Sequence, residues 1–189
     1  MTPVDQILAS SLYVSTYTGK QFYPLAPTPE QIDIEDIAHG LAYQCRFNGQ
    51  TRYFYSVAQH SLIVADLVAQ DLRAAALLHD AAEAYMGDMV KPLKQLFPLF
   101  SEIESKVMSV VGLRYGIGNF DDPAIKRADL IALAMEKRDL MPNSSEPWDS
   151  LKGIVASPIR ITPMSPQEAK AAFLKAFLAV YPIPDVPQK

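Results

Sequence analysis

The apolar residues between positions 34 and 42 recur with the spacing of an amphipathic helix. They stand at positions 34, 37, 38, 41 and 42, on one face of a helix with 3.6 residues per turn. Asp33 precedes the run and suits the N-cap position, because its carboxylate can accept a hydrogen bond from a free backbone N–H. The pattern therefore predicts a helix that begins after Asp33.

A second helix is predicted after Ser56, which is again a favoured N-cap residue. Val57, His60, Val64 and Leu67 share one face of this helix. Because the other three residues are apolar, we expect His60 to point into the protein from the first helical turn.

A third helix is predicted from residue 72 to about residue 85, in a segment rich in Ala and Leu. Asp71 precedes it as a candidate N-cap, and Gly87 follows it as a helix breaker. Pro92 and Pro98 interrupt the connection that comes next.

Start and stop signals predict two further helices. Residues 100–111 are expected to form a helix that ends at Gly112. Asp122 followed by Pro123 is typical of a helix start, a cap with proline at the first helical position. This helix is expected to run to Met141, because the proline that follows cannot continue it.

The remaining segments predict little regular structure apart from one more helix. Residues 11–25 alternate loosely and predict a short hairpin or extended arm. Residues 142–166 contain five prolines and predict a surface excursion, with a possible strand at 159–161. Residues 166–180 predict a final amphipathic helix, and residues 181–189 a flexible tail. The expectation is one all-α domain over residues 1–189, in which residues 1–30 form the arm and a loop.

Composition narrows the classes of protein. The net charge of −4 disfavours broad binding of a nucleic-acid polymer. No run of about 18 apolar residues occurs and no basic region opens the chain, so neither a membrane span nor a secretory signal is expected. Cys45 is the single cysteine, which excludes an intrachain disulfide and fits a cytoplasmic protein.

Four polar residues fall within these otherwise apolar helices: His60, the adjacent pair His79 and Asp80, and Asp129. A carboxylate is costly to desolvate unless it is paired or binds a metal. Two imidazoles and two carboxylates suit a divalent zinc, cobalt, manganese, iron or nickel ion, and two carboxylates balance its charge. Four ligands leave coordination positions for water and a phosphate oxygen. The alternatives are a satisfied core histidine and a local ion pair.

Glu83 follows His79 by four residues and Asp80 by three. On a helix it would lie one turn further along the same flank, at about 5–6 Å between Cβ atoms. This position makes Glu83 the best candidate for proton transfer to and from a water molecule and a leaving oxygen. The alternative is a solvated helix residue.

The segments 54–62 and 79–88, taken together with Asp129, resemble the signature of the HD-domain metal-dependent phosphohydrolase superfamily, an all-helical fold. They are most similar to its small branch, which contains bacterial deoxyribonucleoside 5′-monophosphatases and phage deoxynucleoside triphosphohydrolases. The matching motifs run from about Tyr17 to Leu140, most of the chain.

The resemblance implies roles for individual residues. It implies that His60, His79, Asp80 and Asp129 hold the metal, and that Asp88 contacts a ribose hydroxyl or helps to hold a second ion. Additional magnesium, manganese or cobalt can accompany a triphosphate substrate.

The resemblance also implies a substrate site. Arg46 would hold phosphate through its guanidinium and Phe47 would pack on the nucleoside, where the family frequently has tryptophan. Lys91 and Lys94 can neutralise further phosphates. Glu136 follows Asp129 by seven residues, so it shares the same helix face and can orient Arg46.

The expected function is hydrolysis of a deoxynucleotide by metal-activated water that attacks phosphorus, in a homo-oligomer such as a dimer or hexamer. Release of phosphate from a monophosphate and release of triphosphate from a triphosphate both remain open. The gap of 50 residues between His79 and Asp129 resembles the compact phage enzymes and favours triphosphates slightly. A non-catalytic nucleotide sensor is the alternative. Other HD-domain chemistry, such as phosphodiesterase or oxygenase activity, is disfavoured because extra histidines are missing near the motif.

Overall fold

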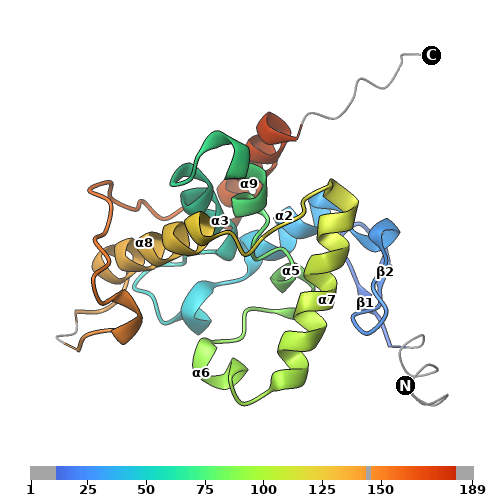
Figure 1. The fold of residues 1–189 in the computed structure, drawn as a ribbon, viewed down its shortest axis with the longest axis horizontal. Helices are drawn as coiled ribbons and strands as arrows, with labels where there is room; N and C mark the ends of the chain where they lie inside the picture. The colour runs from blue at the N-terminus through green and yellow to red at the C-terminus, as the bar shows by residue number, and fades with distance from the viewer. Residues whose placement is uncertain (1–11, 144–145, 182–189) are drawn as a thin grey trace.

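The computed structural model describes residues 12–143 and 146–181. Within these ranges the protein is all-α with a short N-terminal hairpin, which confirms the predicted fold class (Figure 1). The α-helices are α2 (Ile34–Tyr43), α3 (Val57–Asp66), α4 (Arg73–Leu77), α5 (Glu83–Met86), α6 (Lys91–Lys94), α7 (Pro98–Tyr115), α8 (Pro123–Asp139) and α9 (Pro166–Val180). The 3₁₀ helices are η1 (Pro29–Gln31), η2 (Arg46–Gly49), η3 (Gln70–Leu72) and η4 (Asp149–Leu151).

The hairpin pairs β1 (Val14–Ser15) with β2 (Gln21–Phe22) in antiparallel register, with Val14 opposite Phe22. Phe22 is fully buried and stacks on Tyr85 at 4.2 Å between ring centroids, so the hairpin is held to the helical body by α5. The first 11 residues of the predicted arm lie outside the described residues.

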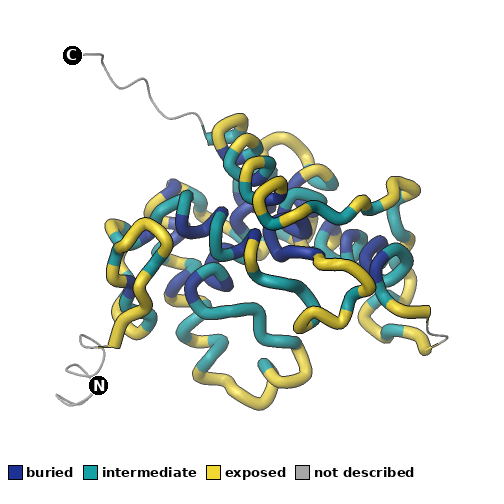
Figure 2. Tube along the Cα trace, turned by 180° about the vertical axis from the view of Figure 1, so that it is seen from behind, coloured by how far each residue is buried: buried dark blue, intermediate teal, exposed yellow. Residues whose placement is uncertain are grey.

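Helix α3 occupies the centre of the molecule and contacts α2, α4, α8 and α9. Val57, Ala58 and Val64 are fully buried, and the dark blue core in Figure 2 surrounds this region. Because α3 is enclosed on several sides, partners inside the protein are needed by the polar side chains on its buried face. His60 is one of them.

The predicted caps at three helix starts are confirmed. The side chain of Asp33 accepts a hydrogen bond from the N–H of Glu35 at 3.0 Å. Ser56 accepts from the N–H of Gln59 at 3.1 Å, and the Asp122 carboxylate caps α8. Each cap satisfies a backbone donor that the helix leaves without an internal partner.

Two predicted helix ends are wrong. Helix α7 continues through Gly112 and ends at Gly116, which has a φ of 66°. Gly112 instead makes room for the returning chain, whose Ile117 N–H donates to the Gly112 carbonyl at 2.9 Å. Helix α8 ends at Asp139, before Met141, because the N–H groups of residues 140 and 141 both turn back to the carbonyl of Glu136.

The predicted single helix over 72–85 is also wrong. The chain forms the short helices α4 and α5, and residues 78–82 between them lie in turns. Asp71 belongs to η3 and is not a cap, because the cap position of α4 is occupied by Leu72 without a side-chain hydrogen bond.

The proline-rich excursion contains η4 but no strand in its described part, so the strand proposed at 159–161 is wrong. The Ile161 N–H donates to the Asp139 carboxylate at 3.0 Å instead of to a neighbouring strand. The Gln59 side chain donates to the Thr162 carbonyl at 2.7 Å and accepts from the Met164 N–H at 2.9 Å. These bonds fasten the excursion to α3.

Beyond the excursion, α9 has the predicted bounds and packs against α2, α3 and α4. Of the predicted tail, residues 182–189 lie outside the described residues. None of the helices in the described ranges is long and apolar enough to cross a membrane.

Replacing Gly40 by Ala should destabilise the protein. A Cβ atom at this position of α2 would lie 2.7 Å from the backbone oxygen of Ala84 in α5. The clash should cost about 1–3 kcal/mol and exceed the gain of up to about 1 kcal/mol that Gly→Ala gives in an open helix. Thermal unfolding would therefore shift downward by several degrees. Gly118→Ala is the control, since nothing lies within 4 Å of its Cβ. A higher melting temperature for Gly40→Ala would contradict the close packing.

Candidate metal centre and adjoining cavity

The candidate centre begins with two histidines on different elements. His60 lies in the first turn of α3 and is fully buried, as its position on the apolar face predicted. His79 lies in the turns between α4 and α5. The two rings stand 5.3 Å apart between centroids.

In the turns that carry His79, the backbone hydrogen bonds span three residues instead of the four of an α-helix. The N–H groups of residues 81, 83, 84 and 85 each donate to a carbonyl three residues earlier. At three residues per turn, Asp80 and Glu83 stand nearly above one another. The ring of His79 is itself part of this local structure, because its Nδ1 lies 2.8 Å from the Ala76 carbonyl.

Both histidines turn Nε2 to the centre, because Nδ1 is in contact with another part of the protein. His60 Nδ1 lies 2.7 Å from Glu136 Oε1, and His79 Nδ1 contacts the carbonyl of Ala76. Nδ1 is engaged by an acceptor in both contacts, so Nε2 is the ring nitrogen that each histidine turns to the centre. Histidines that bind metals are commonly held in this way, with the second ring nitrogen donating to a carboxylate or carbonyl.

Two carboxylates face these Nε2 atoms. Asp129 Oδ1 lies 3.2 Å from His60 Nε2, while Asp80 Oδ2 lies 3.6 Å from His60 Nε2 and 3.2 Å from His79 Nε2. His60 Nε2 is buried and has no hydrogen-bond partner. An unpartnered imidazole nitrogen that faces carboxylates fits a cation, and His60, His79 and Asp129 form a group that can hold a metal ion.

The four predicted ligands are thus brought together, but Asp80 is placed differently from the other three. The ligand atoms of His60, His79 and Asp129 lie within 4.8 Å of one another. Asp80 contacts both histidines but is not a member of that compact group.

Glu136 is the buried anchor of the centre. Its side chain is completely buried and contacts three groups: His60 Nδ1, the Tyr55 hydroxyl at 3.0 Å and the Arg46 guanidinium at 3.3 Å. Burial raises the pKa of Glu136, but the charges of Arg46 and His60 outweigh it and hold the pKa below its usual value. The face shared with Asp129 indicated Glu136 as a partner of Arg46. No sequence signal indicated that the Tyr55 hydroxyl would take part.

The neighbouring charges also set the protonation of His60 and Asp129. Burial and the charge of Arg46 lower the pKa of His60. The opposing effects of Glu136 and Asp129 are larger, and the pKa is raised to about 9. Burial raises the pKa of Asp129, and the His60 contact lowers it well below its usual value. Since a ligating imidazole must be neutral, an ion has to displace the His60 proton.

Glu83 and Asp88 lie beside this group. Glu83 is 9% exposed, and its Oε2 has no hydrogen-bond partner. Burial, with the charges of Asp80 and Asp88, raises its pKa well above the usual value. Burial and the charge of Asp80 also raise the pKa of Asp88. With the Gln44 amide oriented so that its nitrogen faces the Glu83 carbonyl, it donates to that carbonyl at 3.1 Å and accepts from the Asp88 N–H at 2.8 Å.

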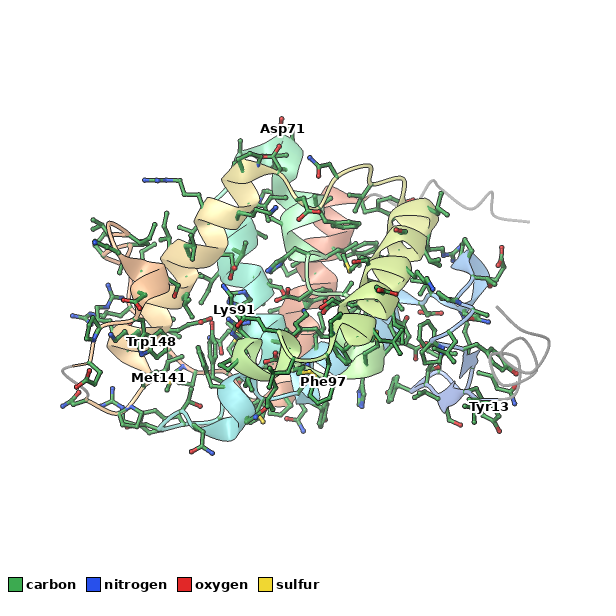
Figure 3. All side chains as sticks on the ribbon, turned by 60° about the horizontal axis from the view of Figure 1, so that its bottom comes forward. Tyr13, Asp71, Lys91, Phe97, Met141 and Trp148 are labelled. Atoms are coloured by element: carbon green, nitrogen blue, oxygen red, sulfur yellow. The ribbon has the colours of Figure 1, made fainter. Side chains whose placement is uncertain are left out.

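Arg46 reaches the centre, and its guanidinium carbon also lies 5.3 Å from the centroid of the Phe47 ring. The Arg46 guanidinium lies 3.8 Å from Asp80, and its side chain is 13% exposed. Phe47 packs against Trp148 at 5.9 Å between ring centroids. Figure 3 shows Trp148 beside Met141, at the end of the molecule opposite Tyr13.

A cavity of about 910 Å³ opens beside the centre, between α7, the 116–121 loop and α8. His79, Asp80 and Asp129 lie on its wall, and the side chain of Asp129 is 42% exposed. Lys94 also lines the cavity, where it forms an ion pair with Glu104, whereas Lys91 is exposed on α6 and lies outside the lining. No sequence pattern indicated that α7 and the following loop form this wall.

The fold and the site define a class: an all-α protein with a candidate metal centre open to a large cavity. No protein-family model matches the chain. The chain is 39% identical over 166 residues to the uncharacterized protein YfdR of Escherichia coli strain K12, a match that covers 87% of this chain and 93% of that protein. It is 37% identical over 174 residues to the uncharacterized protein RCAP_rcc00048 of Rhodobacter capsulatus, covering 82% of this chain and 89% of that protein. The chain therefore belongs to the same protein family as these two bacterial proteins.

His79→Ala should abolish tight binding of a divalent transition metal, because it removes one of three converging ligand atoms. His39→Ala is the matched control, since this third histidine stacks between Tyr17 and Tyr43 away from the centre. Metal content after dialysis, measured by mass spectrometry, should fall only in His79→Ala. Equal metal content in the two variants would rule out the centre.

Proposed function

We propose that the protein is a metal-dependent phosphohydrolase of the HD-domain type that acts on a deoxynucleotide. The observation that carries the proposal is the convergence of His60 Nε2, His79 Nε2 and two carboxylates beside a cavity whose wall includes His79, Asp80 and Asp129. The motifs in segments 54–62 and 79–88 supply His60, His79 and Asp80, and α8 supplies Asp129.

The proposed cofactor is a divalent ion such as zinc, cobalt, manganese, iron or nickel, held by His60, His79 and Asp129 with Asp80 beside them. When bound, it would activate water and neutralise charge on phosphate oxygens. Nitrogen and carboxylate ligands together suit ions of this intermediate softness. The cavity gives a phosphate ester access to the exposed carboxylate of Asp129.

Glu83 fits the role of proton carrier. A carboxyl group placed beside the reacting water and the leaving oxygen can both take and give a proton. In the proposed reaction, Glu83 takes a proton from the attacking water as the new P–O bond forms. The bond from phosphorus to the leaving oxygen then breaks, and Glu83 returns the proton to that oxygen. Its buried, unpartnered Oε2 beside Asp80 supports this role.

Arg46 fits the role of phosphate ligand. Its guanidinium is fixed by Glu136, and its Nε has no hydrogen-bond partner. Guanidinium groups have five N–H donors, so the contact with Glu136 leaves donors for a phosphate.

Product analysis tests the proposal. The metal-loaded protein would be incubated with deoxynucleoside mono- and triphosphates, and the products separated. Inorganic phosphate would identify a monophosphatase, and triphosphate with a free deoxynucleoside would identify a triphosphohydrolase. Binding of a nucleotide without any turnover would support the sensor alternative, and neither binding nor turnover would refute the proposal.

Glu83→Gln should retain the metal and lose turnover by about 10²–10⁴-fold, because the amide cannot carry the proton. Glu102→Gln, on the exposed surface of α7, is the matched control. Turnover rate and metal content should be measured on the same preparations. Loss of the metal would make Glu83 a ligand, and full activity would assign proton transfer to another group.

Arg46→Lys should lower kcat/KM by about 10- to 150-fold, which corresponds to about 1.5–3 kcal/mol for a lost charged hydrogen bond. Lysine keeps the positive charge beside the buried Glu136 but lacks the planar fork. Arg52→Lys is the control, since the side chain of this exposed arginine donates to the Asp139 carbonyl, away from the centre. An unchanged kcat/KM for Arg46→Lys would make Arg46 a structural partner of Glu136 alone.

A further inference from the structure

The cavity beside the candidate centre follows one face of α7. Glu104, Met108, Gly112 and Gly116 line it and recur every four residues, so they lie in one row along the helix. This row spans about 18 Å at a rise of 1.5 Å per residue. The cavity is therefore long enough to extend well past the metal ligands.

The middle of this row lies next to the candidate centre. The Ala82 N–H donates to Met108 Sδ at 3.4 Å, which ties α7 to the turns that carry His79 and Asp80. From Met108 the cavity extends in two directions along α7. One direction leads to the ion pair of Lys94 and Glu104. The other leads to Gly112.

Toward Gly112, the cavity ends in an apolar region formed by Ile117, Phe120 and Ile125. A Cβ atom on Gly112 would lie 2.6 Å from the Ile117 oxygen and 3.3 Å from Phe120 Cε2. The missing side chain thus lets the loop and the Phe120 ring pack directly on α7. Phe120 is half-buried and lines the cavity.

Helix α8 connects this apolar region to the candidate centre. Ile125 precedes Asp129 by four residues, so the two lie on the same face, one helical turn or about 6 Å apart. Both line the cavity. A ligand with its phosphate near Asp129 would therefore carry its remaining atoms past Ile125 toward Phe120.

We propose that this apolar region binds the base of the nucleotide and that the Phe120 ring is its stacking surface; the inference rests on the proposed function. Nucleic-acid bases stack on aromatic rings with little dependence on which base is present. Ligand pockets of about 300–1,000 Å³ typically combine an apolar wall with a few polar groups, as this cavity does. Phe47, the residue to which the family resemblance gives this role, packs on Trp148 and is not part of the lining.

The test compares ligands that differ only by the base. The full-length Glu83→Gln protein would be loaded with manganese so that ligands are bound but not consumed. Affinities would be measured by calorimetry for deoxynucleoside mono- and triphosphates and for 2-deoxyribose 5-phosphate, which lacks a base. Phe120→Ala removes the ring, Phe120→Leu keeps an apolar side chain for packing, and Phe47→Ala removes the competing ring.

The expected result is a loss of nucleotide affinity of about 5- to 150-fold in both Phe120 variants, from the 1–3 kcal/mol that stacking contributes. Affinity for 2-deoxyribose 5-phosphate should not change, and Phe47→Ala should bind like its parent. Nucleotide affinity that is unchanged in the Phe120 variants, or lost only in Phe47→Ala, would overturn the inference and leave the proposed function intact. Failure of the parent protein to bind any of these ligands would refute both.

Discussion

The rest of the structure depends on one buried carboxylate, that of Glu136. It is fully enclosed and contacts an imidazole, a guanidinium and a phenol that come from α3, η2 and the segment before α3. A carboxylate without such partners would be costly to bury, so the three elements must be in place together. The same contacts orient His60 and Arg46 toward Asp80 and Asp129. The scaffold and the candidate site therefore share one set of bonds.

Much of the fold could be predicted because its signals are local. Caps such as Ser56 and Asp122 act on the backbone within a few residues, and the burial of His60 follows from the apolar residues that share its face. The prediction failed where long-range packing overrides local preference. Ala and Leu favour a helix through residues 78–82, but the ring of His79 and the tight turns form a different structure there. Gly112 was expected to end a helix, yet the space it leaves is used by Ile117.

The candidate site was predictable to a similar degree. The residues that carry charge or imidazole were found from their types, because burying them in apolar helices needs a reason. The cavity wall could not be predicted from the sequence, since Met108, Phe120 and Gly112 look like ordinary packing residues there. Phe47 was singled out by resemblance, and only the three-dimensional arrangement shows that it faces Trp148.

The two hydrogen bonds by which Gln59 fastens the proline-rich excursion to α3 affect how the protein folds during its synthesis. Gln59 immediately precedes His60, and its partners Thr162 and Met164 follow it by 103 and 105 residues. At about 5–20 residues per second, a ribosome needs about 5–20 s to make the intervening chain. Over that interval α3 exists without its final polar contacts, and contacts of such long sequence separation form slowly. The excursion should therefore be fastened to α3 only after residues 162–164 have been made, later than the residues of the candidate metal centre.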